Sequence, residues 1–382
     1  MKTSHRLAIL VIGFALLSPS RVPSAEEPNA EAPEIVQEDA WVPVPFRVRN
    51  LTFPTVLTMG FMPRPTNAIG KGAWAVELNA SVSNNFQMSA GIEDWLNQRG
   101  GERRPLSRTD AAAIFSELEE PQFLIDGELN VVDLTVHVGL SLRVSASLRI
   151  GYLGYTGGFM DSFIQGFHDL VGIGQAGREF IGKGNFQILF MNDGESLVLH
   201  DRPSSGGVTD PTLSLTYSFP KTVKGWSFSV EGAVKPPVAD EDDWLSSGSW
   251  DIGVQVSAQR IWGKNAVVLN LAAVAPGDFN VEGSFDPATL PSANLAYIRQ
   301  ATPRTTAVVQ ALYSENIFRD EVDSDLSAYE FQMTAGVRFD ALGGVIGVAV
   351  TENLFNFDNT PDFGFHVSYS RLIGGRKVRN AG

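Results

Sequence analysis

The stretch YEFQMTAGVRF, residues 329–339, places an apolar residue at every odd position and a polar residue or glycine at every even position. Successive side chains of a β-strand point to opposite faces, so this pattern indicates a strand with one apolar and one polar face. The same alternation recurs in six further stretches: 74–82, 142–152, 213–219, 226–234, 250–258 and 363–369. Weaker strand candidates are 123–138, 265–275, 293–301, 304–314 and 344–353. In the first of these the phase changes at Val131 and Val132, which predicts a β-bulge.

The segments between these candidate strands alternate between long and short along the chain. Bacterial outer-membrane barrels have tight turns at one end and longer loops at the other. We therefore predict an all-β fold, a transmembrane antiparallel meander β-barrel of about 12 strands at residues 46–375. The chain starts and ends on the short-turn side, so both termini are expected in the periplasm. A secreted soluble β-protein is the alternative.

The N-terminal residues indicate export. Lys2 and Arg6 precede an apolar run at 7–17, and small residues follow, which is typical of a secretory signal peptide at 1–25. Residues 26–45 are acidic and rich in proline and predict a disordered linker. Residues 376–382 are expected to form a C-terminal tail.

Composition excludes several classes of protein. The chain of 382 residues has 43 acidic and 29 basic residues and a net charge of −14, which argues against a nucleic-acid partner. It contains no cysteine, so it has no disulfide and no thiolate nucleophile. No phosphate-binding, dinucleotide or zinc-protease motif is present, so neither a cofactor nor a metal is expected. The expected partners are outer-membrane lipid, the barrel-assembly machinery and a small-molecule solute.

The polar faces of the strands predict what lines the lumen. They carry charges of both signs, at Glu77, Asp126, Glu128, Asp133, His137, Arg143, Arg149, Glu231, Lys235, Asp251, Glu330, Arg338 and His366. These residues form either ion pairs across the lumen or a selectivity filter. About eight strands leave a lumen filled by side chains and about sixteen leave an open channel. A narrow pore, a plugged pore and a closed scaffold all remain possible.

The long external loop at 156–208 has the most distinctive sequence of the predicted loops. Apolar residues at helical spacing predict a short amphipathic helix at 160–171, which either enters the barrel mouth as a plug or lies on the rim. The candidate plug residues are Asp161, Phe163, Phe167, His168, Asp169 and Arg178. Asp161 and His168 would be about 10.5 Å apart along a helix, too far to form a catalytic pair.

A second helix is expected in the first external loop. Ser107 and Asp110 have the spacing of a capping box, and an apolar stripe follows them. This helix is predicted to cover the mouth beside the other long loop.

The GGF-D-FHD-GR pattern between Gly157 and Arg178, the segment FLIDGE at 123–128 and the segment DFGFHVSYS at 362–370 resemble one family. It is a family of uncharacterised Gram-negative outer-membrane β-barrel proteins catalogued as a domain of unknown function. The resemblance covers most of residues 40–375. Its hallmark positions are Asp126, Gly127, Glu128, Gly157, Gly158, Phe159, Asp161, Phe167, His168, Asp169, Gly177 and Arg178. The resemblance implies a barrel in the outer membrane and no assigned activity.

Three functions follow from the sequence. The first is a narrow or plugged channel, or an uptake protein, for a small or apolar solute. The second is a sealed structural or assembly barrel. The third is an outer-membrane hydrolase with a rim site near His168. The sequence does not decide whether the protein is an enzyme, but it favours a role without catalysis. No residue is assigned as catalytic.

Overall fold

The computed structural model describes residues 42–99, 103–172, 177–192, 195–220, 222–281, 286–319, 325–353 and 359–373. All of them belong to one compact unit, Trp41–Lys377. The signal peptide, most of the linker and the C-terminal tail lie outside the described residues, so these assignments stay predictions.

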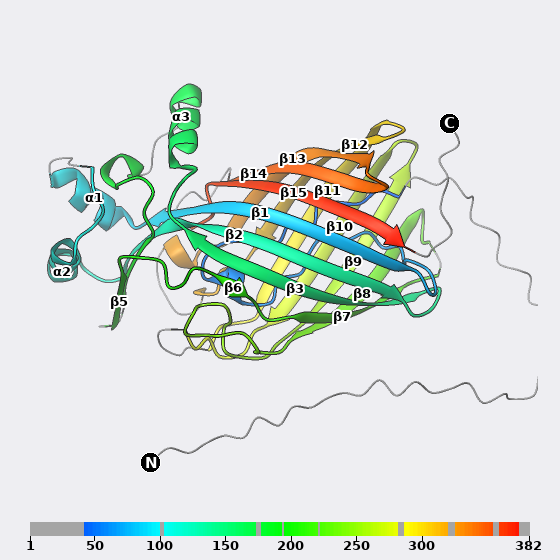
Figure 1. The fold of residues 1–382 in the computed structure, drawn as a ribbon, viewed down its shortest axis with the longest axis horizontal. Helices are drawn as coiled ribbons and strands as arrows, with labels where there is room; N and C mark the ends of the chain where they lie inside the picture. The colour runs from blue at the N-terminus through cyan, green and yellow to red at the C-terminus, as the bar shows by residue number, and fades with distance from the viewer. Residues whose placement is uncertain are drawn as a thin grey trace, which may run out of the picture. The chain divides into compact units, whose positions relative to one another are not determined.

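Twelve strands form a closed antiparallel barrel, because β1 pairs with β15 as well as with β2 (Figure 1). They are β1 (Trp74–Met88), β2 (Gln122–Gly139), β3 (Val144–Thr156), β7 (Thr212–Ser218), β8 (Trp226–Lys235), β9 (Asp251–Trp262), β10 (Asn265–Ala275), β11 (Leu290–Thr302), β12 (Thr305–Ser314), β13 (Glu330–Ala341), β14 (Gly344–Asn353) and β15 (Phe363–Ile373). The predicted meander of 12 strands is confirmed.

Loop length sorts the two ends of the barrel. Short turns join β2 to β3, β7 to β8, β9 to β10, β11 to β12 and β13 to β14 at one end, which we call the short-turn end. The longer connections all lie at the opposite end, the long-loop end. The sorting therefore matches the alternation of long and short segments in the sequence.

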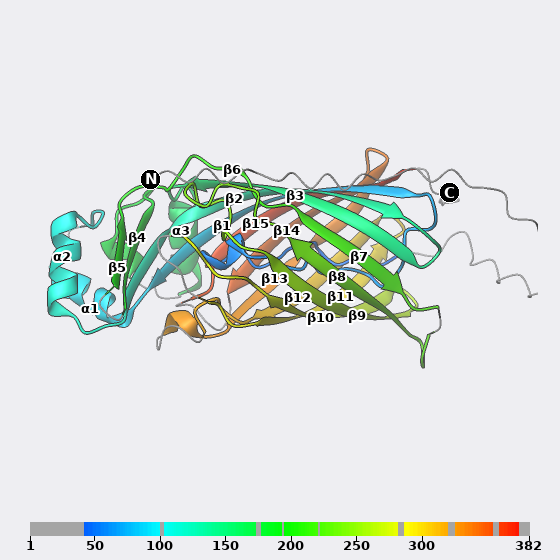
Figure 2. The same ribbon diagram turned by 90° about the horizontal axis from the view of Figure 1, so that it is seen from below.

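Additional elements stand at the long-loop end (Figure 2). They are α1 (Ala90–Gln98), α2 (Arg108–Glu117), α3 (Asp161–Val171), β4 (Gln187–Asn192), β5 (Glu195–Leu199), β6 (Gly207–Val208) and the single turns η1 (Thr55–Leu57), η2 (Arg178–Phe180) and η3 (Asp325–Ser327). β4 pairs with the first residues of β2, and β5 pairs with β4, so this hairpin extends the sheet beyond the barrel. None of the described helices is long and apolar enough to cross a bilayer.

The cap of α2 has the predicted capping box. The Asp110 amide donates to the Ser107 hydroxyl, and the Ser107 amide donates to the Asp110 carboxylate at 2.8 Å. The Arg104 guanidinium, which donates hydrogen bonds to that carboxylate, holds the pKa of Asp110 below its usual range. The apolar side of α2 then packs with α1 on the outward face of the extended β1 and β2, in a cluster that includes Phe86 and Ile114.

The outward face of the barrel is an exposed apolar surface. Large side chains such as Val256, Leu271 and Val337 are exposed there by 47%, 50% and 43%. Exposed aromatic residues stand at the short-turn end, among them Trp74 and Trp262. A soluble monomer rarely exposes so much contiguous apolar surface, whereas a barrel in a bilayer needs it.

β2 differs from the prediction in one detail. The phase change at Val131 and Val132 is not a bulge, because the pairing of β2 with β1 runs without a shift from Met88↔Leu124 to Trp74↔Val138. The alternation changes for another reason. Near the long-loop end, protein covers both faces of β2, so buried polar residues such as Glu128 occupy the outward face.

Leu271→Arg tests the lipid-facing assignment of β10. A cation near the middle of an outward face would destabilise the folded barrel by about 2–4 kcal/mol. Leu142→Arg, in the exposed turn before β3, is the matched control and should cost little. The measurement is the free energy of unfolding of each variant in lipid vesicles; equal stability of the two variants would contradict a membrane-spanning wall.

Candidate functional site

Residues 42–66, which we call the inner segment, run inside the barrel (Figure 2). Both ends of the segment hydrogen-bond Gln259, near the short-turn end of β9. Its middle reaches the long-loop end, where the Thr52 hydroxyl donates to Glu330. The segment therefore enters from the short-turn end, turns near η1 and returns, and its first residues, 42–45, lie in the lumen rather than in the predicted linker.

Ion pairs fix the inner segment to one side of the lumen. Arg47 Nε lies 3.0 Å from Glu77, Arg49 Nε lies 3.6 Å from Asp133, and Arg64 Nη1 lies 3.0 Å from Glu231. The acidic partners come from β1, β2 and β8. All six side chains are at most 17% exposed. Each charge depends on its partner, because removing one member of a buried pair leaves an uncompensated charge.

The opposite side of the lumen is apolar where it meets the start of the inner segment. Phe46 and Val48 pack against a cluster of small and branched residues on β10, β11, β12 and β14. Two polar residues in this region hold the backbone. Gln310 accepts from the Phe46 amide at 2.9 Å, and Arg338 donates to the Pro45 carbonyl at 2.8 Å.

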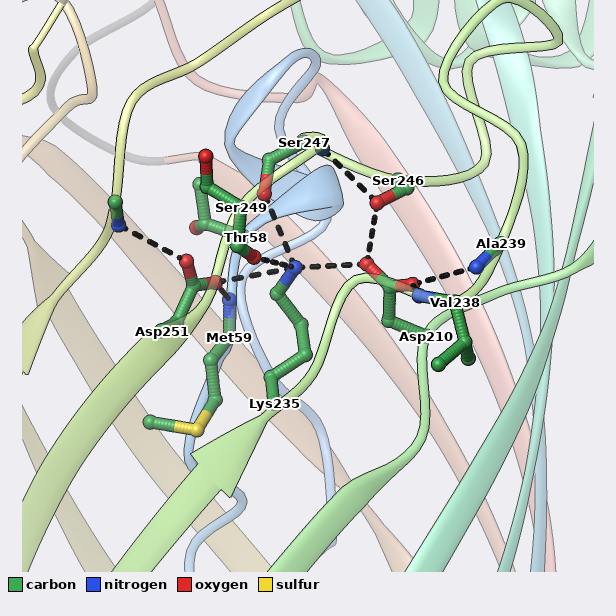
Figure 3. Close-up of polar contacts among 12 residues, drawn as sticks. Thr58, Met59, Asp210, Lys235, Val238, Ala239, Ser246, Ser247, Ser249 and Asp251 are labelled. Carbon is green, nitrogen blue, oxygen red and sulfur yellow. Dashed lines mark hydrogen bonds and ion pairs between the residues drawn. The ribbon is translucent and has the colours of Figure 1, made fainter. Parts of the chain in front are cut away.

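The turn of the inner segment is tied to the long loops through Lys235 (Figure 3). The Met59 amide donates to Asp251 at 2.6 Å, and Lys235 Nζ lies 3.4 Å from the same carboxylate. Lys235 also donates to Asp210 at 2.8 Å. Asp210 accepts from the amides of Val238 and Ala239 in the β8–β9 loop, so one buried lysine connects this loop to the inner segment.

Two small cavities lie beside the described part of the inner segment. One cavity of about 30 Å³ lies between Gly60 and Arg149, and another of about 10 Å³ lies between Thr58 and Asp133. Volumes of this size hold single waters. In these places the segment leaves no room for a larger solute.

An apolar pocket of about 490 Å³, which we call the mouth pocket, lies at the long-loop end. Its lining residues are Phe53, Pro54, Ile125, Ile188, Phe190, Glu195, Ser196, Leu197, Trp244, Phe279, Val281, Phe318 and Leu326. Phe53 and Pro54 belong to the inner segment. The Phe53 ring stacks on Trp244 with centroids 5.2 Å apart, and Phe190 stacks on Phe318 at 5.7 Å. A few polar groups among many apolar ones are typical of a small-molecule site.

Most of the predicted lumen residues face the interior. Those that contact the inner segment are Glu77, Asp133, Arg149, Glu231, Asp251, Glu330 and Arg338. His137 lies 3.5 Å from Glu77, and His366 lies between the hydroxyls of Ser81 and Thr351. The interior charges therefore pair mainly with the inner segment rather than across an empty lumen.

Three of the predicted lumen residues lie elsewhere. Arg143 is exposed in the short turn before β3. Asp126 and Glu128 have the same parity on β2 as the exposed residues Val132 and Leu134, so they face outward. They are nevertheless buried, because the long loop 157–211 covers them: the Met160 amide donates to Glu128 at 2.6 Å.

The helix predicted in that loop exists as α3, but it is not a plug, because it stands outside the barrel wall (Figure 1). Phe163 meets the outward-facing Phe363 edge to face at 5.2 Å. His168 is buried and Asp169 is exposed, whereas the side chain of Phe167 lies outside the described residues.

Arg178 is the centre of the contacts that hold the long loop. Its guanidinium is buried, lies 3.2 Å from Asp161 and 2.5 Å from Asp362, and donates to Asn84. It also stands 4.2 Å from the centroid of the Phe86 ring. Asp161 additionally accepts from the Gly184 amide. Residues of the GGF-D-FHD-GR pattern thus fasten the loop to the outer wall. Among the described residues, no group of His, Asp and Glu is placed to hold a metal ion.

Sequence reasoning missed the inner segment. The signal was present: residues 42–66 contain three arginines and no acidic residue, although acidic residues surround them in the linker and on the strands. Without strand or helix periodicity, that charge pattern alone pointed to a partner in the lumen.

Residues 97–372 match the family described as "Protein of unknown function (DUF3187)". The chain belongs to this family. The resemblance found in the sequence to a family of unknown function is thus confirmed. No curated protein matches the chain.

Solved structures of barrel channels are similar in chain trace. The COG4313 outer membrane channel from Pseudomonas putida F1 has 13% identity and a TM-score of 0.49, over 81% of this chain and 99% of that chain. The P. putida toluene transporter TodX has 9% identity and a TM-score of 0.37, over 79% and 90%. The Ralstonia pickettii toluene transporter TbuX has 11% identity and a TM-score of 0.35, over 79% and 90%. These scores are too low for the solutes of those channels to be transferred to this chain.

Arg178→Met tests the attachment of the long loop. The substitution leaves Asp161 and Asp362 buried without their cation, a loss of about 3–5 kcal/mol in docking the loop. Amide hydrogen exchange over residues 157–186 should become much faster, while exchange in β9–β12 stays unchanged. The exposed neighbour Glu179→Gln is the control. Unchanged protection in the Arg178 variant would contradict the account.

Proposed function

We propose that the protein is an outer-membrane channel for a small apolar solute, closed by its inner segment and carrying its solute site in the mouth pocket. The observation that carries this proposal is that Phe53 and Pro54 of the inner segment form part of the pocket lining. A solute in the pocket therefore touches the element that blocks the lumen, and a solute that binds more tightly to the open barrel than to the closed one would favour displacement of that element.

The apolar lining supports the choice of solute. Burial of apolar surface is favourable by about 25 cal/mol per Å², so a hydrocarbon gains affinity from these walls, whereas a charged solute loses hydration and finds only Glu195 among the lining residues. A pocket of about 490 Å³ is of the size that small ligands occupy.

The apolar belt and the sorting of the loops support the location. The exposed side chains on the outward face would contact outer-membrane lipid, with the long loops outside and both termini in the periplasm. The inner segment would then enter from the periplasmic end, after export and insertion of the barrel by the barrel-assembly machinery.

A sealed structural barrel is the second candidate. The water-sized cavities beside the inner segment favour it. For a rim hydrolase near His168, Asp161 is not available as a base, because both of its carboxylate oxygens accept hydrogen bonds that fix the loop.

Conductance in planar bilayers separates an openable channel from a sealed barrel. In the triple variant R47Q/R49Q/R64Q the inner segment loses its three ion pairs and leaves unpaired acidic residues on the wall. We expect little current from the unaltered chain and frequent openings from the triple variant.

The matched control is R143Q/R260Q/R304Q, which removes the same charge from exposed positions and should stay as silent as the unaltered chain. Heat-modifiable migration verifies that each variant is folded. A folded triple variant without current would count against gating by the inner segment.

Binding of the apolar probe N-phenyl-1-naphthylamine tests the mouth pocket. Leu197→Gln puts an amide into the apolar lining and should weaken binding about tenfold, since an unpaired polar group costs ~1–3 kcal/mol in such a site. Val238→Gln, on an exposed loop position outside the lining, should leave the affinity unchanged. The measurement is probe fluorescence with the barrel in nanodiscs, after subtraction of empty discs. Equal affinities in both variants would place the probe elsewhere.

A further inference from the structure

A second hollow lies outside the mouth pocket. This outer pocket has a volume of about 670 Å³ and is lined by α2, the end of β5 and the residues that follow it. Its floor is apolar, with Ala111, Ala112, Phe115, Val198 and Leu199. Its rim is charged, with Arg108, Asp201, Arg202 and Asp242, so positive and negative residues balance.

One residue, Trp244, is common to the linings of the outer pocket and the mouth pocket. β5 also borders both, since Glu195–Leu197 line the mouth pocket and Val198–Leu199 line the outer one. The two hollows are therefore neighbours that share a wall made by one short strand and one indole side chain.

Trp244 is held in an unusual conformation. Its φ angle is +57°, in the left-handed region that bulky residues rarely adopt, and such strain persists only where the surroundings enforce it. The surroundings do so here: the Tyr155 hydroxyl donates to the Trp244 carbonyl, and the Trp244 amide donates to the Glu241 carbonyl at 2.9 Å. Trp244 is buried, with 3% of the residue exposed.

The same indole touches the inner segment. Its ring is nearly parallel to that of Phe53, with an interplanar angle of 9°. A displacement of the Trp244 ring thus removes one side of the stack that fixes Phe53, next to η1 at the turn of the inner segment.

We propose that the outer pocket is a first docking site for the apolar solute, in series with the mouth pocket, and that Trp244 is the wall that controls passage between them. This inference rests on the proposed function. The balanced charge of the rim suits an uncharged solute, and the apolar floor receives it before the indole moves. Movement of the indole connects the outer pocket with the mouth pocket and loosens Phe53 in the same step.

Cysteine labelling tests this route, because the chain has no native cysteine. Ile125→Cys places a thiol in the buried lining of the mouth pocket. The probe is benzyl methanethiosulfonate, a small apolar thiol reagent, and the readout is the rate of mass shift of the folded barrel in nanodiscs.

Two further substitutions are made in the Ile125→Cys background. Ala112→Trp fills the outer pocket and should slow labelling about tenfold, which corresponds to ~1.4 kcal/mol in the barrier. Ser116→Trp, exposed on the same helix and outside the lining, should leave the rate unchanged. Trp244→Ala should speed labelling about tenfold, and Trp244→Phe, which keeps an aromatic wall, should give an intermediate rate.

Equal rates in the Ala112→Trp and Ser116→Trp proteins would overturn the serial route. A Trp244→Ala protein that reacts no faster than its parent would overturn the role of the indole. The same labelling can also contradict the proposed function. If, in all of these proteins, the thiol at position 125 reacts with the charged sulfonatoethyl analogue at least as fast as with the benzyl reagent, the mouth pocket is not an apolar solute site. The proposed function then fails together with this inference. If the thiol reacts faster with the benzyl reagent but Ala112→Trp and Ser116→Trp give equal rates, the proposed function is supported and only the serial route is contradicted.

Discussion

Three arginines of the inner segment and three acidic residues of the barrel wall form the contacts on which the interior depends. Arg47, Arg49 and Arg64 pair with acidic residues of β1, β2 and β8. Neither set is stable alone in a narrow lumen, because a buried charge without a partner loses several kcal/mol of hydration. The pairs make the segment and the wall dependent on each other. Displacement of the segment, as proposed above, would let water into the lumen, and that water would restore the hydration of both sets.

The barrel was predictable because a strand in contact with lipid needs an apolar residue at every second position. Segments such as Tyr329–Phe339 expose one face to lipid, so their alternation is readable without a structure. The alternation holds only along the part of each strand that faces lipid. Beyond the rim, Asp126 and Glu128 face outward into protein, and their polarity wrongly indicated the lumen. The inner segment has no periodic sequence pattern, because the barrel wall surrounds it and side chains on all of its sides make contacts.

The family pattern has a structural explanation in the contacts of Arg178. Asp161 and Asp362 come from distant parts of the sequence and meet at one guanidinium on the outer wall. That arrangement holds the long loop beside the mouth and leaves the lumen to the inner segment. The helix expected to plug the barrel therefore stands outside the wall, and the segment that occupies the lumen comes from the N-terminal side of the first strand.

The central claim is that residues 42–66 occupy the lumen of the folded barrel. Amide hydrogen exchange of peptides from this segment, measured on the full chain in lipid bilayers, tests it most directly. Strong protection is predicted for the amides of Phe46, Phe53 and Met59, each of which donates to a wall side chain. The claim would be contradicted if these amides exchanged as fast as those of an unstructured peptide in a protein whose strands remain protected.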